Sequence, residues 1–107
     1  MKTLILALVL GATFVSSSYS EDKKHTYKPP GGYVPDEKTA IAIALAVWNP
    51  IYGEDQIKKE KPYKAELKDG VWYVRGSLPP SINIVGGVAE AEISQDDARI
   101  IRVSHGK

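Results

Sequence analysis

The residues of this chain that could do catalytic chemistry begin with its two histidines. His25 lies in a charged, proline-rich stretch, and His105 follows Ser104 close to the C-terminus. A serine and a histidine make a nucleophile and base only where their side chains meet. Neighbouring residues of a strand point to opposite faces of a sheet, so Ser104 and His105 do not form such a pair directly. We interpret His105 as a structural residue.

Two glutamates form the other candidate pair. Glu90 and Glu92 are two apart on an expected strand, so they share a face with roughly 7 Å between their Cα atoms. Such a pair can do acid–base work, but we favour a solvated outer face on which Glu92 pairs with Arg102. The chain has no cysteine to bind a metal, and its two histidines are far apart in the sequence. No motif supplies the carboxylates that would complete a metal site. We therefore predict no catalytic residues, no metal site and no cofactor.

Glycines and aromatic residues add no clear site. Gly86 and Gly87 precede a strand pattern rather than a helix, which a phosphate-binding loop would require. Several large aromatic side chains could line a pocket, but their spacing is that of ordinary core residues: Trp48, Tyr52, Tyr63 and Trp72.

The N-terminus has the pattern of a secretory signal. Lys2 precedes an apolar run over residues 4–15, and residues 18–20, Ser-Tyr-Ser, have the form of a cleavage site. The run is shorter than the roughly 20 residues that span a bilayer. We predict a signal peptide over residues 1–20 and a periplasmic or secreted product without a membrane anchor. A buried N-terminal helix is the alternative.

The remaining chain has the size of one small domain. The 107 residues carry a formal net charge of +1 and no basic cluster, so nothing indicates a nucleic-acid partner. Without disulfides, a small exported domain depends on its core or on a partner. We expect a disordered lead over residues 21–33, rich in charge, proline and glycine, and a folded domain over residues 34–107.

One long helix is predicted over residues 36–49. Alanine at alternate positions favours a helix over a strand. Pro35, Asp36 and Glu37 suit a helix start, and Pro50 biases Asn49 away from helical geometry. The expected core stripe is Ile41, Leu45, Trp48 and Tyr52. Most of the helix surface is apolar, so Ile43 and Val47 form a candidate partner surface if they are exposed. A short helical turn anchored by Ile57 is expected next.

Two hairpins are predicted after the helix. Asp69-Gly70 is a strong two-residue turn signal that pairs Lys68 with Val71 and Leu67 with Trp72. The second hairpin has a three-residue loop that pairs Gln95 with Arg99, and its left-handed position is filled by Ala98 instead of glycine.

The second hairpin sets a further register. Ile93 then faces Ile101, Ala91 faces Val103, and Glu92 faces Arg102, with Ile101 pointing inward. The connection over residues 78–87 is expected to cover the helix or the sheet end, and a binding loop is the alternative. The fold class is therefore α+β, one N-terminal helix packed on a four-stranded antiparallel meander.

Four stretches together resemble a bacterial family: residues 34–40, 48–53, 86–94 and 99–107. They are similar to the immunity proteins with a nuclear-transport-factor-2-like fold that occur in polymorphic toxin systems. One departure is Asp97-Ala98, where an Asp-Gly turn would be typical. The resemblance implies a small cone-like fold that binds and neutralises a cognate protein toxin, and it supplies no catalytic residues.

The leading hypothesis is therefore an exported immunity protein, not an enzyme, whose toxin, contact residues and oligomeric state the sequence does not name. A periplasmic binding or peptidase-inhibitor module of cystatin-like type is the alternative, because it also places a helix on a meander. A third hypothesis is a small enzyme with a pocket near Tyr52, Tyr63 or Glu90.

Overall fold

The computed structural model describes residues 25–78 and 87–106 of the chain. The predicted signal peptide, the first residues of the lead and most of the connection over residues 78–87 lie outside the described residues. The elements, in chain order, are α2 (Glu37–Tyr52), α3 (Glu54–Lys58), β1 (Lys64–Lys68), β2 (Val71–Arg75), β3 (Ala89–Ser94) and β4 (Ile100–His105).

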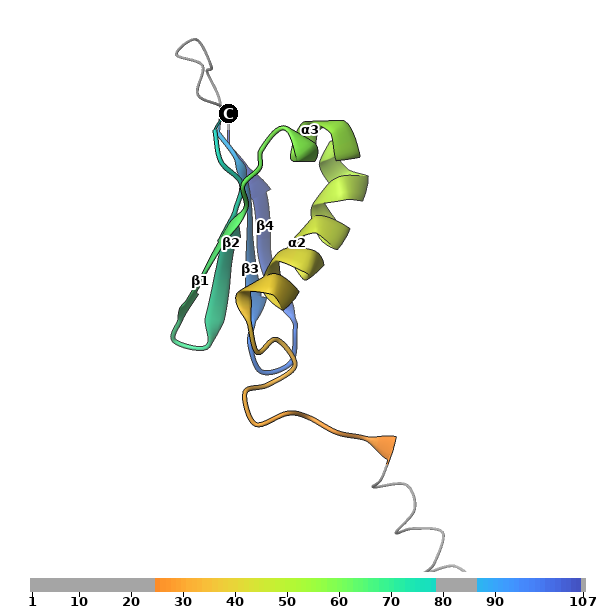
Figure 1. Ribbon diagram of the computed structural model, residues 1–107, viewed down its shortest axis with the longest axis vertical. Helices are drawn as coiled ribbons and strands as arrows, with labels where there is room; N and C mark the ends of the chain where they lie inside the picture. The colour runs from red at the N-terminus through yellow and green to blue at the C-terminus, as the bar shows by residue number, and fades with distance from the viewer. Residues whose placement is uncertain (1–24, 79–86, 107) are drawn as a thin grey trace, which may run out of the picture.

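The predicted α+β architecture is confirmed. The four strands form one antiparallel sheet in the order β1-β2-β3-β4, and α2 lies across one face of it (Figure 1). At one end, α3 follows α2 and leads into β1. The opposite face of the sheet has no covering element among the described residues.

Helix α2 begins as predicted but ends later. Asp36 caps it, with its Oδ1 atom accepting the Thr39 N–H at 2.8 Å. The helix was expected to end at Asn49, yet it continues through Pro50 to Tyr52. Proline lacks one helical donor and restricts the preceding residue, but packing can override these local preferences. Tyr52 packs against the core, and the helix stops at Gly53, which has a φ of 96° and donates its N–H to the Asn49 carbonyl.

The buried face of α2 is an alanine stripe, which corrects the predicted one. Ala40, Ala44 and Trp48 are fully buried, whereas Ile41, Leu45 and Tyr52 are only partly buried. The small side chains let the helix approach the sheet closely, so the larger residues flank the contact instead of filling it. Ile43 and Val47 are also partly buried, so the condition for a partner surface on that side is not met.

The first hairpin has the predicted register. Lys68 pairs with Val71 and Leu67 with Trp72. Both turn residues are left-handed, Asp69 with a φ of 51° and Gly70 with a φ of 77°, as a turn of this type requires.

The second hairpin departs from the prediction near its turn. Ala91 faces Val103 and Glu92 faces Arg102 as expected, but a bulge between Glu92 and Ile93 sets Ile93 opposite Ile100 instead of Ile101. The turn is longer than three residues, because Ser94, not Gln95, bonds to Arg99. The bulge absorbs the additional residue. Ile101 is consequently 43% exposed instead of pointing into the core.

The second half of the predicted disordered lead is held against this turn. Tyr33 and Val34 donate their backbone N–H groups to the carbonyls of Asp96 and Gln95 at 3.0 Å each. Lys28 pairs with the Asp96 carboxylate at 2.9 Å. These contacts correct the prediction of disorder for residues 28–33.

Candidate functional site

The most unusual side chain of the described domain is a buried glutamate. Glu60 follows the short helix α3 and is only 3% exposed. It lies three residues after Ile57, which is also buried. Residues three apart on a helical turn face the same way, so the apolar anchor of α3 directs Glu60 inward.

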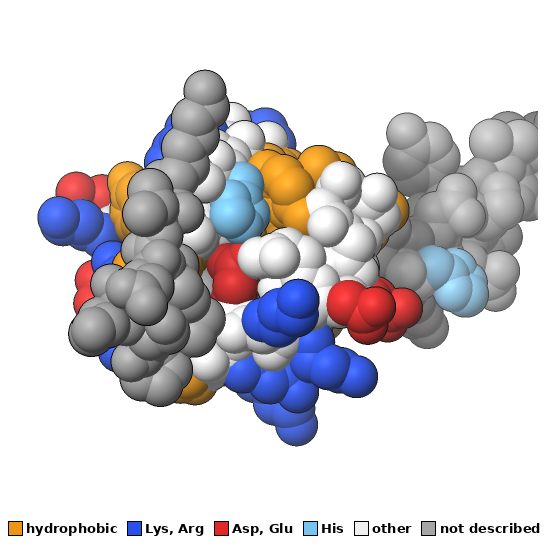
Figure 2. Space-filling view, turned by 90° about the horizontal axis from the view of Figure 1, so that it is seen from above, with side chains coloured by type: hydrophobic (Ala, Val, Ile, Leu, Met, Phe, Trp, Pro, Cys, Tyr) orange, Lys and Arg blue, Asp and Glu red, His pale blue; other side chains and the backbone are white. Residues whose placement is uncertain are grey.

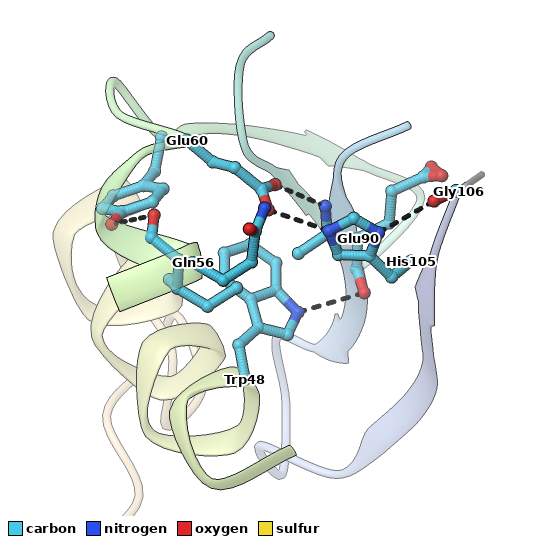
Figure 3. Close-up of polar contacts among 9 residues, drawn as sticks. Trp48, Gln56, Glu60, Glu90, His105 and Gly106 are labelled. Atoms are coloured by element: carbon cyan, nitrogen blue, oxygen red, sulfur yellow. Dashed lines mark hydrogen bonds and ion pairs between the residues drawn. The ribbon is translucent and has the colours of Figure 1, made fainter. Parts of the chain in front are cut away.

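The Glu60 carboxylate accepts three hydrogen bonds from described residues. Its Oε1 atom accepts the Ala89 N–H at 2.7 Å. Its Oε2 atom accepts from Nε2 of His105 at 2.8 Å and from Nε2 of Gln56 at 3.1 Å (Figure 3). Its backbone carbonyl accepts the Ser77 N–H at 2.7 Å. One residue thus joins α3, the chain after β2, the start of β3 and the end of β4.

These contacts shift the pKa of both charged partners. Burial alone would raise the pKa of Glu60, but the Ala89 N–H and the His105 and Gln56 side chains outweigh it, and the pKa falls below 4.5. The pKa of His105 rises above 6.5, first because of Glu60 and then because of the Gly106 carbonyl. Both ring nitrogens face oxygen acceptors, Nδ1 facing the Gly106 carbonyl at 2.8 Å. Only the protonated ring donates from both nitrogens.

The arrangement suits a structural link better than an acid–base site. With both nitrogens engaged, the ring has no free nitrogen to take a proton from a bound molecule. The Tyr52 ring lies over one side of the imidazole, with 5.0 Å between ring centroids. Among residues 25–78 and 87–106, no group of three His, Cys, Asp or Glu side chains is arranged to hold a metal ion.

The structure separates the residues that the sequence singled out. Ser104 accepts a hydrogen bond from Arg102 on the outer face of the sheet, whereas His105 points to Glu60. Glu90 and Glu92 both pair with Arg102, at 3.8 and 2.6 Å, and the predicted Glu92–Arg102 pair is therefore confirmed. His25 is exposed, and Gly86 lies outside the described residues.

Three aromatic residues that the sequence singled out, Trp48, Trp72 and Tyr63, are core or structural residues. Trp48 donates its Nε1–H to the Glu90 carbonyl at 3.2 Å, and Trp72 donates to the Val34 carbonyl at 2.7 Å. Tyr63 donates its hydroxyl to the Ile57 carbonyl at 2.8 Å. Each buried polar tip therefore has a partner, as expected of aromatic residues in a core.

Sequence reasoning missed Glu60. It lies between lysines in a charged segment, which reads as solvated surface. The available signal was its spacing from Ile57, the one apolar anchor of that segment. The bonds to Ala89 and His105 span 29 and 45 residues, and no local pattern predicts contacts of that range.

The structure is that of a small α+β domain. Its buried Glu60–His105 pair and its outer-face Glu90 and Glu92 are engaged in hydrogen bonds and ion pairs within the domain. The chain belongs to a family of immunity proteins: a family model described as an NTF2 fold immunity protein matches residues 39–107. This match covers most of α2 and all four strands. The resemblance seen in the sequence is thereby confirmed, and so is an NTF2-like helix-on-sheet fold.

A comparison with curated proteins also finds a relative that matches most of the chain. The chain is 31% identical over 93 residues to the uncharacterized protein YhhH of Escherichia coli (strain K12), which covers 87% of this chain and 70% of that protein. No solved structure gives a significant match. No helix within residues 25–78 and 87–106 has the length and apolar character needed to cross a bilayer.

Proposed function

We propose that this protein is exported and neutralises a cognate bacterial toxin by binding it. The family match carries the proposal, because it identifies an immunity protein and spans the whole sheet. The predicted signal over residues 1–20 supports export. The engaged nitrogens of His105 support a role in binding over one in catalysis.

Co-expression tests the proposal directly. Toxin domains encoded beside the gene are produced in a sensitive bacterial host, each directed either to the cytoplasm or to the periplasm. The full chain should restore growth against one periplasmic toxin and co-purify with it as a complex of fixed stoichiometry. Failure to restore growth and to form a complex with any of them would overturn the proposal.

A truncated variant tests export separately. Deletion of residues 2–20 should abolish protection against the periplasmic toxin while leaving binding of the purified toxin unchanged. Mass spectrometry of the exported protein should show Glu21 as its first residue. Protection by the truncated variant would contradict export as the route to the toxin.

A further inference from the structure

The outer face of the sheet, opposite α2, carries an open hollow of about 530 Å³. It is lined by side chains from β1, β2 and β3: Lys64, Glu66, Lys68, Tyr73, Arg75 and Glu90. The strand register explains why they share one face, because Lys64 faces Arg75, Glu66 faces Tyr73, and Arg75 faces Glu90 on the next strand. The sheet itself therefore builds this surface.

The charges of this hollow are unevenly compensated. Arg102 binds both Glu90 and the neighbouring Glu92, at 3.8 and 2.6 Å. Among the described residues, no ion pair engages Lys64, Lys68 or Arg75. Glu66 is the remaining acid of the lining. Three cations thus face solvent against one free carboxylate, and the hollow favours an anionic partner.

Tyr73 lies in the middle of this ring of charges. Its side chain is 42% exposed although β2 is an inner strand, paired with β1 on one side and β3 on the other. An inner strand holds the tyrosine in place, so little conformational entropy is lost when a partner covers it. Tyrosine and arginine are the residues that most often contribute large binding energies at protein interfaces.

The lining indicates a macromolecular partner. Small-molecule sites are mostly apolar and enclose their ligand, whereas this hollow is open and five of its six lining residues are exposed. Figure 2 shows the molecule from above, at the α3 end, where Lys and Arg side chains also gather on one side.

We propose that the outer-face hollow is the docking surface for the toxin and receives an acidic segment of it. Carboxylates of the toxin pair with Lys64, Lys68 and Arg75, and an apolar or aromatic side chain packs on Tyr73. This inference rests on the proposed function and specifies which face performs it. The opposite face of the sheet is unsuited to the role, because α2 already covers it.

A charge-reversal variant tests the surface. Lys64→Glu/Lys68→Glu/Arg75→Glu should bind the toxin identified by co-expression at least about tenfold more weakly than the unmodified protein. The matched control is Lys38→Glu/Lys58→Glu/Lys59→Glu, which makes the same change of net charge at exposed positions of α2, α3 and the residue after α3. The control should bind within about threefold of the unmodified protein, since its charges lie away from the hollow. Equal binding by both triple variants would overturn the proposed surface while leaving toxin binding intact.

Two single substitutions test the same surface with less risk of misfolding than the triple variants. Tyr73→Ala should weaken toxin binding at least about fivefold, whereas Tyr27→Ala, which truncates a tyrosine that is 74% exposed, should not. Circular dichroism melting of each variant shows whether the fold is retained. Unchanged affinity of a folded Tyr73→Ala variant would count against the hollow.

A defined probe separates failure of the surface from failure of the function. Hexaglutamate titrated into the ¹⁵N-labelled protein should shift the amide resonances of Glu66, Tyr73 and Arg75, and hexalysine should not. If these shifts appear but no toxin binds, the proposed function fails while the surface remains an acidic-peptide site. Absence of the shifts, or equal shifts with inorganic phosphate alone, would overturn the proposal of an acidic protein partner.

Discussion

The imidazole of His105 lies with its Nε2 atom 2.8 Å from Oε2 of Glu60. The two residues come from the last strand and from the chain after α3, and the pair closes the end of the domain where α3 lies. The side chains on both sides of the contact are largely buried. Their charges are therefore screened less than those of a surface pair.

The stability of the domain should pass through a maximum in mildly acidic solution. The raised pKa of His105 stabilises the fold fully below about 6.5, and this contribution is lost as the pH rises through the folded-state value. The lowered pKa of Glu60 stabilises it above about 4.5, and this contribution is lost as the pH falls. Urea unfolding at several pH values should place the maximum between these two limits.

A histidine substitution checks the origin of that profile. His105→Gln should flatten the alkaline side of the curve, because glutamine can donate one bond to Glu60 but carries no charge. His25→Gln is the matched control at an exposed position and should leave the profile unchanged. Equal profiles for His105→Gln and the unmodified protein would show that this pair does not control the pH dependence.

Gly76→Ala should destabilise the domain by about 1–3 kcal/mol through overpacking. A Cβ atom at this position would lie 2.7 Å from Oε1 and 2.8 Å from Cβ of Glu60, so the glutamate would have to leave its bonds. Gly31→Ala is the control, because its added atom would meet only Pro35 at an ordinary 3.7 Å. Chemical denaturation that finds both variants equally stable would contradict the tight contact.

Because α2 packs on the sheet through buried alanines, we expect the effect of a larger side chain on stability to depend on its position in the helix. Ala44→Leu should cost about 1–3 kcal/mol in unfolding free energy, because Ala44 is fully buried against the sheet. Ala42→Leu should stay within about 0.5 kcal/mol of the unmodified protein, because Ala42 is exposed. The reverse order in thermal melts would mean that another face of the helix meets the sheet.

Ala98→Gly should raise the melting temperature. Ala98 has a φ of 65°, and removing its Cβ relieves a left-handed strain of about 1 kcal/mol. Part of this gain is offset because Ala98 packs against the core. The same change at the exposed helical residue Ala42 should lower stability by about 1 kcal/mol. A lower melting temperature for Ala98→Gly would show that its packing outweighs the strain.

The elements of the fold followed from local signals. Alanine content and the cap at Asp36 predicted α2, and Asp69-Gly70 predicted the first hairpin with its register. The wrong predictions, the end of α2 and its buried face, concern features that tertiary packing determines. Pro50 is tolerated inside the helix because the turn beyond it packs on the core, and Ala40 and Ala44 are buried because small residues allow close approach.

The contacts of the candidate site could not be predicted from local sequence patterns, because they too depend on tertiary packing. The sequence indicated a structural role for His105, but it gave no partner for the ring. The partner, Glu60, looks like one charge among lysines in the sequence, and its carboxylate meets the Ala89 N–H only once the sheet has assembled. The bulge beside Ile93 was missed because the turn is longer than its sequence suggests.

The buried glutamate also bears on how long the folded protein persists. Its bonds close loops of 29 and 45 residues, so they should form after the hairpins, late in folding. Glu60→Gln should then accelerate unfolding roughly fivefold while leaving the refolding rate nearly unchanged. Stopped-flow measurements in urea distinguish this from slower refolding. In the proposed role of an exported protein that awaits its toxin, the chain would then depend on Glu60 for the lifetime of its folded state more than for its speed of folding.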